Sequence, residues 1–239
     1  MKIPRFEDLI IFENEDYILI NKPPHLATLD ERIDTPNIKK IAQAYCPTAQ
    51  VCHRLDKETS GALAIAKNPE AYRNMAIQFE DRLVKKKYHA VVEGIQDFEE
   101  VNVYLPILAL KNGTVRIDKQ EGKLAETFFN TLKAYRKHTL VECEPVTGRM
   151  HQIRIHLSVL KAPIVCDEQY GGKPIYLSQI KKKGFNLKKE TEEQSLISRV
   201  ALHAFSLQFS LMNGEEIKVE APYPKDFDVL VKQLEKYSG

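Results

Sequence analysis

The chain has 239 residues, of which 43% are hydrophobic and 28% are charged, and its formal net charge is +2. These values lie near the averages of globular proteins and exclude the disordered, collagen-like and disulfide-scaffold classes. No apolar run approaches the roughly 20 residues that span a bilayer, and the first residues lack the apolar core of a signal peptide. We therefore expect a cytoplasmic protein without a membrane partner. Any nucleic-acid site must come from local clusters of basic residues.

Hydrophobic periodicity and turn residues predict a series of strands and helices. In chain order, they are a hairpin of residues 10–12 and 17–20, a helix containing 38–45, a buried strand at 62–66, a helix from 69 to 83, a strand at 88–93, several antiparallel strands between 101 and 144, a helix at 150–160, a hairpin of 202–211 and 216–220, and a last helix containing 227–234. Thr35 is the expected cap of the first helix. Residues 178–195 are polar and rich in Lys and Glu, which favours a loop.

This mixture of hairpins and helices, without regular β-α-β alternation, predicts an α+β fold. Four cysteines are spread without a C-x-x-C pair, which argues against a zinc knuckle and against a disulfide framework. Lysine clusters lie at residues 85–87, 181–183 and 188–189, although a run of charge usually marks a solvated face.

The most informative segment is residues 53–61, which read HRLDKETSG. A nearby guanidinium favours the ionised form of Asp56, and a tight turn fixes where its side chain points. Without further information, an Asp that merely braces a turn through Arg54 is the simpler interpretation. The run, however, resembles the HRLD-x-x-TSG signature of the RluA/RluC/RluD-type pseudouridine synthases, in which the Asp is the catalytic residue.

Two more segments resemble that family. Residues 147–156 read TGRMHQIRIH, similar to the family's TGR-x-HQIR-x-H, and imply that Arg154 forms the salt bridge that positions the catalytic carboxylate. Residues 87–94 read KYHAVVEG and imply that Tyr88 stacks on the target base and assists proton transfer. A phenol suits both tasks, although a core Tyr is common.

The resemblance also implies that Arg54 enters the RNA stack when the uridine leaves it, since a base must be extruded to reach an enclosed site. The expected substrate-binding residues are Arg54, His53, Thr59, Lys87, Arg149, His151 and Gln152. Phosphate contacts are expected from Lys85 to Lys87 and from the loop around Lys181 to Lys189.

Some positions depart from the family pattern. His25 stands where the family usually has Gly after the Lys-Pro turn, Met150 replaces a common Thr, and Cys166 replaces the usual Gly before Asp167. None of these departures touches an expected catalytic position.

The family implies the pseudouridine synthase fold, with a central mixed, largely antiparallel sheet flanked by helices and loops. We expect a single catalytic domain over residues 1–239 without a separate N-terminal RNA-binding module, acting as a monomer. The expected activity is isomerisation of uridine to pseudouridine in a structured tRNA or rRNA stem-loop, without a metal or an organic cofactor.

Two alternatives remain. A metal-dependent hydrolase would use His53, His151, His156 and Cys52, but His151 and His156 are five residues apart and diverge around a helix. A non-catalytic RNA-binding protein on the same fold would tolerate the loss of the Asp56 carboxylate. The sequence does not say which RNA or which uridine is the substrate.

Overall fold

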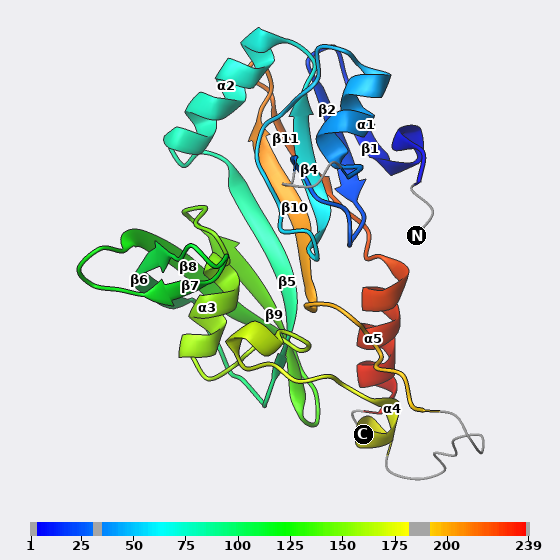
Figure 1. Cartoon of the computed structure of the whole chain (residues 1–239), viewed down its shortest axis with the longest axis vertical. Coiled ribbons are helices and arrows are strands. Elements are labelled where there is room, and N and C mark those ends of the chain that lie inside the picture. Colours follow the sequence, from blue (N-terminus) through cyan, green and yellow to red (C-terminus); the bar gives the residue numbers. More distant parts are fainter. Residues whose placement is uncertain (1–3, 31–34, 182–191, 238–239) are drawn as a thin grey trace. The chain divides into compact units, whose positions relative to one another are not determined.

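The computed structural model describes residues 4–30, 35–181 and 192–237. The chain divides into two units (Figure 1): the first comprises residues 1–88 and 203–222, and the second comprises residues 89–202 and 223–239. Each unit is built from separate stretches of the chain. The single catalytic domain over residues 1–239 stays a prediction.

The first unit is a sheet with two α-helices. Its elements are η1 (Phe6–Leu9), β1 (Ile10–Glu13), β2 (Tyr17–Lys22), α1 (Ile38–Tyr45), β3 (Gln50–Val51), β4 (Ser60–Ala66), α2 (Pro69–Glu80), β10 (Leu202–Ser210, from its second residue) and β11 (Glu216–Glu220). The strand order is β1-β2-β4-β10, with β3 paired to β4 and β11 paired to β10. Strand β4 runs antiparallel to β2 but parallel to β10, and both predicted hairpins are confirmed. The sheet is therefore mixed and largely antiparallel, as predicted.

Strand β4 lies at the centre of this unit, and all seven of its residues are buried. Leu63 and Ile65 pack in one apolar cluster, whereas Ala62, Ala64 and Ala66 pack in a second cluster with residues of α2. Because both faces are covered, the strand reads as a continuous apolar run rather than as an alternating one.

Both helices of the first unit start at asparagine caps. The Asn68 side chain accepts a hydrogen bond from the Ala71 amide at 2.8 Å, at the predicted start of α2. The prediction for α1 is wrong in its cap, because Asn37, and not Thr35, accepts from the Lys40 amide at 3.0 Å. The predicted end of α2 is wrong as well. The helix ends at Glu80, and Leu83 lies beyond it and is 60% exposed.

The second unit is antiparallel. Strand β5 (Lys85–Glu93) passes from the first unit into the second, and the remaining elements are β6 (Val101–Ala109), β7 (Val115–Ile117), β8 (Lys123–Ala134), β9 (His138–Pro145), α3 (Gln152–Val159), η2 (Glu168–Tyr170), α4 (Leu177–Ile180) and α5 (Lys225–Lys236). The order β5-β9-β8-β6-β7 places β8 between β9 and β6. The pairings of β6, β7, β8 and β9 confirm the predicted antiparallel middle region.

Side-chain bonds fix the helices of this unit. In the core, the His156 side chain of α3 lies 3.0 Å from the Thr127 hydroxyl of β8. The buried Arg199 forms an ion pair of 2.7 Å with Asp226 in the first turn of α5. The predicted loop at 178–195 is wrong at its start, where α4 forms, and residues 182–191 lie outside the described part of the chain. Among the described helices, none is long and apolar enough to cross a membrane.

Candidate active site

The segment that carries Asp56 begins at His53, in the first unit. The His53 Nε2 atom accepts a hydrogen bond from the Ala64 amide of β4 at 3.1 Å, and its ring lies against Phe79 with the centroids 5.1 Å apart. Burial lowers the pKa of this imidazole to about 3. The accepting role of Nε2 requires the neutral ring, so the lowered pKa and the hydrogen bond agree.

Asp56 opens a tight turn whose backbone is bound on both sides. The Thr59 amide donates to the Asp56 carbonyl at 3.0 Å, which closes the turn. Before the turn, the Thr28 hydroxyl donates to the Leu55 carbonyl at 2.7 Å and accepts from the Leu55 amide at 3.1 Å. Asp56 itself is half-buried, next to the buried Leu55 and the exposed Arg54.

Lys22 binds the same turn from within the protein. Its side chain is fully buried, and Nζ donates to the carbonyls of Pro23, Leu26 and Lys57 at 3.0, 2.8 and 3.2 Å. An ammonium can be buried at tolerable cost when several acceptors surround it. The sequence analysis assigned Lys22 no role, since these three acceptors are backbone carbonyls, which every residue type provides.

The turn ends at a close approach between strands. Thr59 and Ser60 are buried, and the Ser60 hydroxyl lies 2.9 Å from Nδ1 of His203, whose Nε2 lies 3.0 Å from the Ala221 carbonyl. Gly61 follows with φ = +118°, and a Cβ atom there would lie 2.1 Å from the Ala204 carbonyl oxygen. Only glycine fits at this position, which explains the Ser-Gly pair of the motif.

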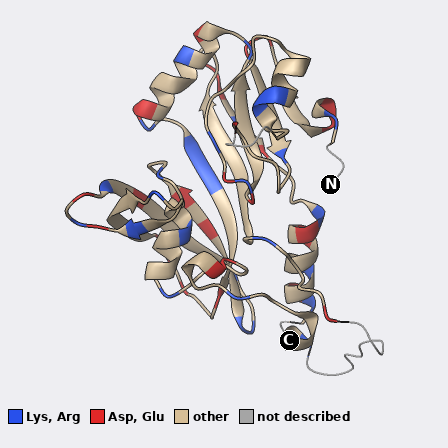
Figure 2. Ribbon diagram, in the orientation of Figure 1, with Lys and Arg blue, Asp and Glu red and all other residues tan. Residues whose placement is uncertain are grey.

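Strand β5 brings Tyr88 and the lysine cluster into the first unit. Tyr88 is half-buried and packs against the apolar cluster that contains Leu55, so Tyr88 and the residue before Asp56 share one packing environment. Lysines 85–87 begin the strand, where Figure 2 shows a stretch of basic residues. Lys86 lies over the Phe79 ring at 5.9 Å, and burial lowers the pKa of its ammonium to about 8. Lys87 is half-buried.

In the second unit, the guanidinium of Arg154 on α3 is held by several side chains. Its Nε and Nη2 atoms donate to the two carboxylate oxygens of Asp167, both at 2.7 Å, and Nη2 also donates to Oε1 of Gln169 at 2.9 Å. The guanidinium lies over the Tyr170 ring at 4.9 Å. This bidentate and stacked arrangement fixes the plane of the guanidinium. The pairing of Arg154 with Asp56, expected from the sequence, stays a prediction.

Asp167 is the second residue that the sequence analysis missed, since it was noted only as the residue after Cys166. Its side chain is 1% exposed, and its backbone carbonyl accepts from the amides of Tyr170 and Gly172. Its carboxylate pairs with Arg154, which lies 13 residues earlier in the chain, and no local sequence pattern reveals a bond over that separation.

The remaining predicted residues surround the start of α3. Gln152 is buried; its amide oxygen accepts from the Thr147 hydroxyl and the Arg149 amide, and its NH₂ donates to Glu126 O and Thr127 Oγ1. His151 has φ = 51°, and its Nδ1 lies 2.8 Å from the Tyr170 hydroxyl. Arg149 is exposed. Gln152 and His151 are therefore fixed by protein groups, whereas Arg149 is exposed and its Nε donates only a long bond of 3.4 Å to the Leu124 carbonyl.

Metal ligation has no support in the described residues, where no group of three or more His, Cys, Asp or Glu side chains is arranged to hold an ion. Two of the histidines proposed for a metal have other partners: His53 accepts from Ala64, and His156 lies against Thr127. Burial also lowers the pKa of His156 to about 4.

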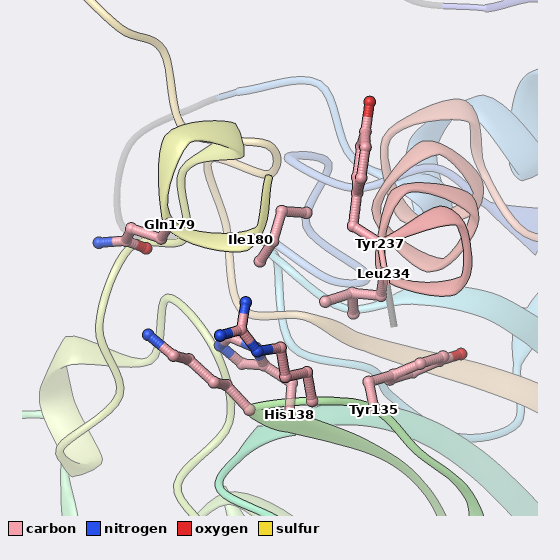
Figure 3. Close-up of a pocket in the computed structure, with 8 residues that line it drawn as sticks. Tyr135, His138, Gln179, Ile180, Leu234 and Tyr237 are labelled. Atoms are coloured by element: carbon pink, nitrogen blue, oxygen red, sulfur yellow. The ribbon is translucent and has the colours of Figure 1, made fainter. Parts of the chain in front are cut away.

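A small pocket in the second unit contains none of the predicted site residues (Figure 3). Its lining consists of Tyr135, Arg136, Lys137, His138, Gln179, Ile180, Leu234 and Tyr237. Figure 3 shows Ile180 of α4 and Leu234 of α5 near the β8–β9 turn, with the Tyr237 ring pointing away. The pocket lies where two helices pack beside a hairpin, and we assign it no chemistry.

Comparison with known proteins decides the family. The sequence pattern of the RNA pseudouridylate synthase family matches residues 16–159, which include Asp56, Tyr88 and Arg154. The chain belongs to the RNA pseudouridylate synthase family. It is 35% identical over 237 residues to ribosomal large subunit pseudouridine synthase C of Buchnera aphidicola, covering 96% of this chain and 71% of that protein. The protein of the same name from Escherichia coli K12 is 33% identical over 241 residues, and the match covers 98% of this chain and 72% of that protein.

Solved structures agree on the fold. Human RNA pseudouridylate synthase domain containing 4 superposes with a TM-score of 0.74 at 23% identity, covering 96% of this chain and 95% of that chain. Human RNA pseudouridylate synthase domain containing 1 superposes with a TM-score of 0.64 at 26% identity, covering 95% of this chain and 94% of that chain. The predicted pseudouridine synthase fold is confirmed, and the chain is an RNA pseudouridine synthase, an isomerase that acts on uridine in RNA.

Proposed function

We propose that this synthase modifies uridine in ribosomal large-subunit RNA and that Asp56 is its catalytic carboxylate. The substrate proposal is supported by the names of the relatives that share 33 to 35% of their aligned residues with this chain. The observation that carries the catalytic proposal is the turn of Asp56, whose flanking residues Leu55 and Lys57 are bound by Thr28 and Lys22. A carboxylate on a turn fixed in this way is preorganised for one task.

The reaction breaks the bond between N1 of uracil and C1′ of the ribose and forms a bond between C5 and C1′. The product has the same atoms as the substrate, since C5 loses a proton and N1 gains one. A carboxylate can assist as a nucleophile near the anomeric carbon or as a base that removes a proton from the sugar. Both roles are open to Asp56, and both disappear when its carboxylate becomes an amide.

Tyr88 is the proposed partner of the uracil ring. An aromatic face can stack on the detached base while it rotates, and the phenol can take part in moving the C5 proton. Its packing against the cluster that contains Leu55 supports this role. A Tyr88→Phe variant keeps the aromatic face and loses the hydroxyl, so it separates stacking from proton transfer.

Arg154 is the proposed cation that supports the catalytic carboxylate, as the family resemblance implies. Its bidentate bonds to Asp167 and its contact with Tyr170 support a role that needs a fixed guanidinium. Lysine cannot reproduce two parallel N–H···O bonds, so Arg154→Lys is expected to lose most of the activity.

RNA contacts are proposed for the exposed and half-buried basic residues. Arg54 and Arg149 are exposed, and lysines 85–87 begin β5. In contrast, Thr59 and Gln152 are buried, His53 and His151 are bonded within the protein, and we assign these four to positioning the RNA-binding segments. The proposed contacts from residues 182–189 lie outside the described residues.

Arg54 is proposed to fill the place of the extruded uridine. Extruding a base costs on the order of a few kcal/mol when it is stacked and much less when it is unconstrained. Arg54→Ala should therefore impair turnover on a folded stem-loop more than on a flexible fragment. An equal loss on both RNAs would refute this role.

The substrate proposal is tested by mapping pseudouridines in total RNA from cells with and without the protein. We expect sites in ribosomal large-subunit RNA to disappear and to return with the wild-type chain but not with Asp56→Asn. Asp81→Asn, an exposed carboxylate at the end of α2, is the matched control and should restore them. Loss confined to tRNA would reject the ribosomal substrate and retain the enzyme. Cytoplasmic location and a monomeric state remain proposals.

A further inference from the structure

The turn that carries Asp56 has two central residues, Lys57 and Glu58, and both are bound by the segment of residues 22–25. Lys57 is bound through its backbone carbonyl, which accepts from the buried Nζ of Lys22 at 3.2 Å. Glu58 is bound through its side chain, whose carboxylate oxygens lie 3.2 and 3.0 Å from Nδ1 of His25. One short segment thus contacts both residues that follow Asp56.

His25 adopts a backbone conformation that is uncommon for residues other than glycine. Its φ is 64°, in the left-handed region that glycine occupies without strain. The chain therefore carries a large residue where the backbone conformation favours the smallest one. Backbone strain of this kind persists where the surrounding structure holds the residue in place, and such positions are more frequent at functional sites.

Within the described part of the chain, the side chain of His25 forms its polar contact with Glu58. Both side chains are 40% exposed, so the pair lies at the surface of the first unit rather than in its core. An ion pair or hydrogen bond at this exposure contributes little to the stability of the folded protein. A role in stability therefore does not explain the strained backbone.

We propose that His25 is a positioning residue for Asp56, acting through Glu58. The bond holds the second central residue of the turn and so limits the directions in which the Asp56 side chain points. This inference rests on the proposed catalytic role of Asp56. Because the geometry of a catalytic group affects the chemical step more than the binding of RNA, the effect should appear in kcat rather than in KM.

The decisive variant is His25→Gly, which removes the side chain and relieves the strain at the same time. Its melting temperature should equal or exceed that of the wild type, whereas kcat should fall about three- to five-fold, the rate factor that corresponds to one exposed pair. KM for the RNA should stay within about twofold. His25→Asn keeps a side-chain donor and tolerates the left-handed conformation, so it should recover most of kcat.

The partner is tested by Glu58→Ala alone and together with His25→Gly. If the two residues act through one bond, the double variant should be no slower than either single variant. Glu100→Gly is the matched control, because Glu100 is an exposed residue with φ = 48° in the second unit. Its kcat should be that of the wild type.

Turnover is followed by release of tritium from C5-labelled uridine in a substrate RNA, with urea unfolding on the same samples. An unchanged kcat in His25→Gly, losses that multiply in the double variant, or a kcat loss that follows a lower melting temperature would each overturn the inference. A wild-type chain that releases no tritium, or an Asp56→Asn variant that is fully active, would instead reject the proposed function. Full activity of His25→Gly beside an inactive Asp56→Asn rejects only the role of His25.

Discussion

The buried pair of Arg154 and Asp167 allows a quantitative prediction for stability. The Asp167 side chain is 1% exposed and that of Arg154 is 10% exposed, and two bonds of 2.7 Å join them. Asp167→Ala would remove the carboxylate that makes two bonds to a buried guanidinium, and breaking a buried ion pair in this way costs about 3–5 kcal/mol of unfolding free energy. This is a large share of the roughly 5–15 kcal/mol that stabilises a typical domain.

Urea unfolding followed by circular dichroism measures this cost. Asp167→Asn keeps one acceptor oxygen and should lose about 1–3 kcal/mol. The double variant Asp167→Ala with Arg154→Met removes both charges and should recover a large part of the loss. Asp228→Ala is the matched control, because its pair with Lys232 is exposed and is expected to contribute at most about 1 kcal/mol.

The reasoning would be refuted if Asp167→Ala lost no more stability than Asp228→Ala. It would also be refuted if the double variant were less stable than Asp167→Ala, because that result would mean that the broken pairing of the Arg154 guanidinium with Asp167 is not the source of the cost.

The remaining predictions concern acid stability, the close approach at Gly61 and binding of RNA. Burial lowers the pKa of His156 from 6.5 to about 4; the unfolded chain therefore binds the proton more readily, and stability that is present above pH 6.5 is lost as the pH falls towards 4, by about 3 kcal/mol in all. A His156→Gln variant should show a flatter dependence of unfolding free energy on pH over that range, and an unchanged slope would contradict this origin. Gly61→Ala places a Cβ atom 2.1 Å from the Ala204 carbonyl oxygen, so the soluble yield and the melting temperature should fall sharply; a wild-type melting temperature would show that the strands can separate at no cost. Lys85→Ala should reduce the slope of log K against log salt for RNA binding by about 0.7–0.9, and an unchanged slope would show that this lysine contacts no phosphate.

Sequence reasoning identified the elements better than their ends. The hairpin of β1 and β2, the buried strand β4 and the start of α2 at Pro69 follow from local patterns, and the structure has all three. Asn37 replaces Thr35 as the cap of α1 because both are suitable cap residues and only the backbone after Pro36 decides between them. Local propensity cannot resolve such a choice.

For the candidate site too, local sequence patterns predicted some features and missed others. The motif around Asp56 is contiguous in the sequence and was found there. The partners of the site residues, Lys22 and Asp167, were missed because their bonds join distant segments or end on backbone carbonyls. His25 was noted only as a departure from the family pattern. Its contact with Glu58 joins residues 33 positions apart and is known only from the structure.

The central claim is that the carboxylate of Asp56 carries out the isomerisation. Tritium release from C5-labelled uridine in ribosomal large-subunit RNA, measured for the wild type and for a folded Asp56→Asn variant, tests it most directly. We predict turnover by the wild type and none above background by the variant, with RNA affinity retained. Undiminished turnover by the variant would contradict the account.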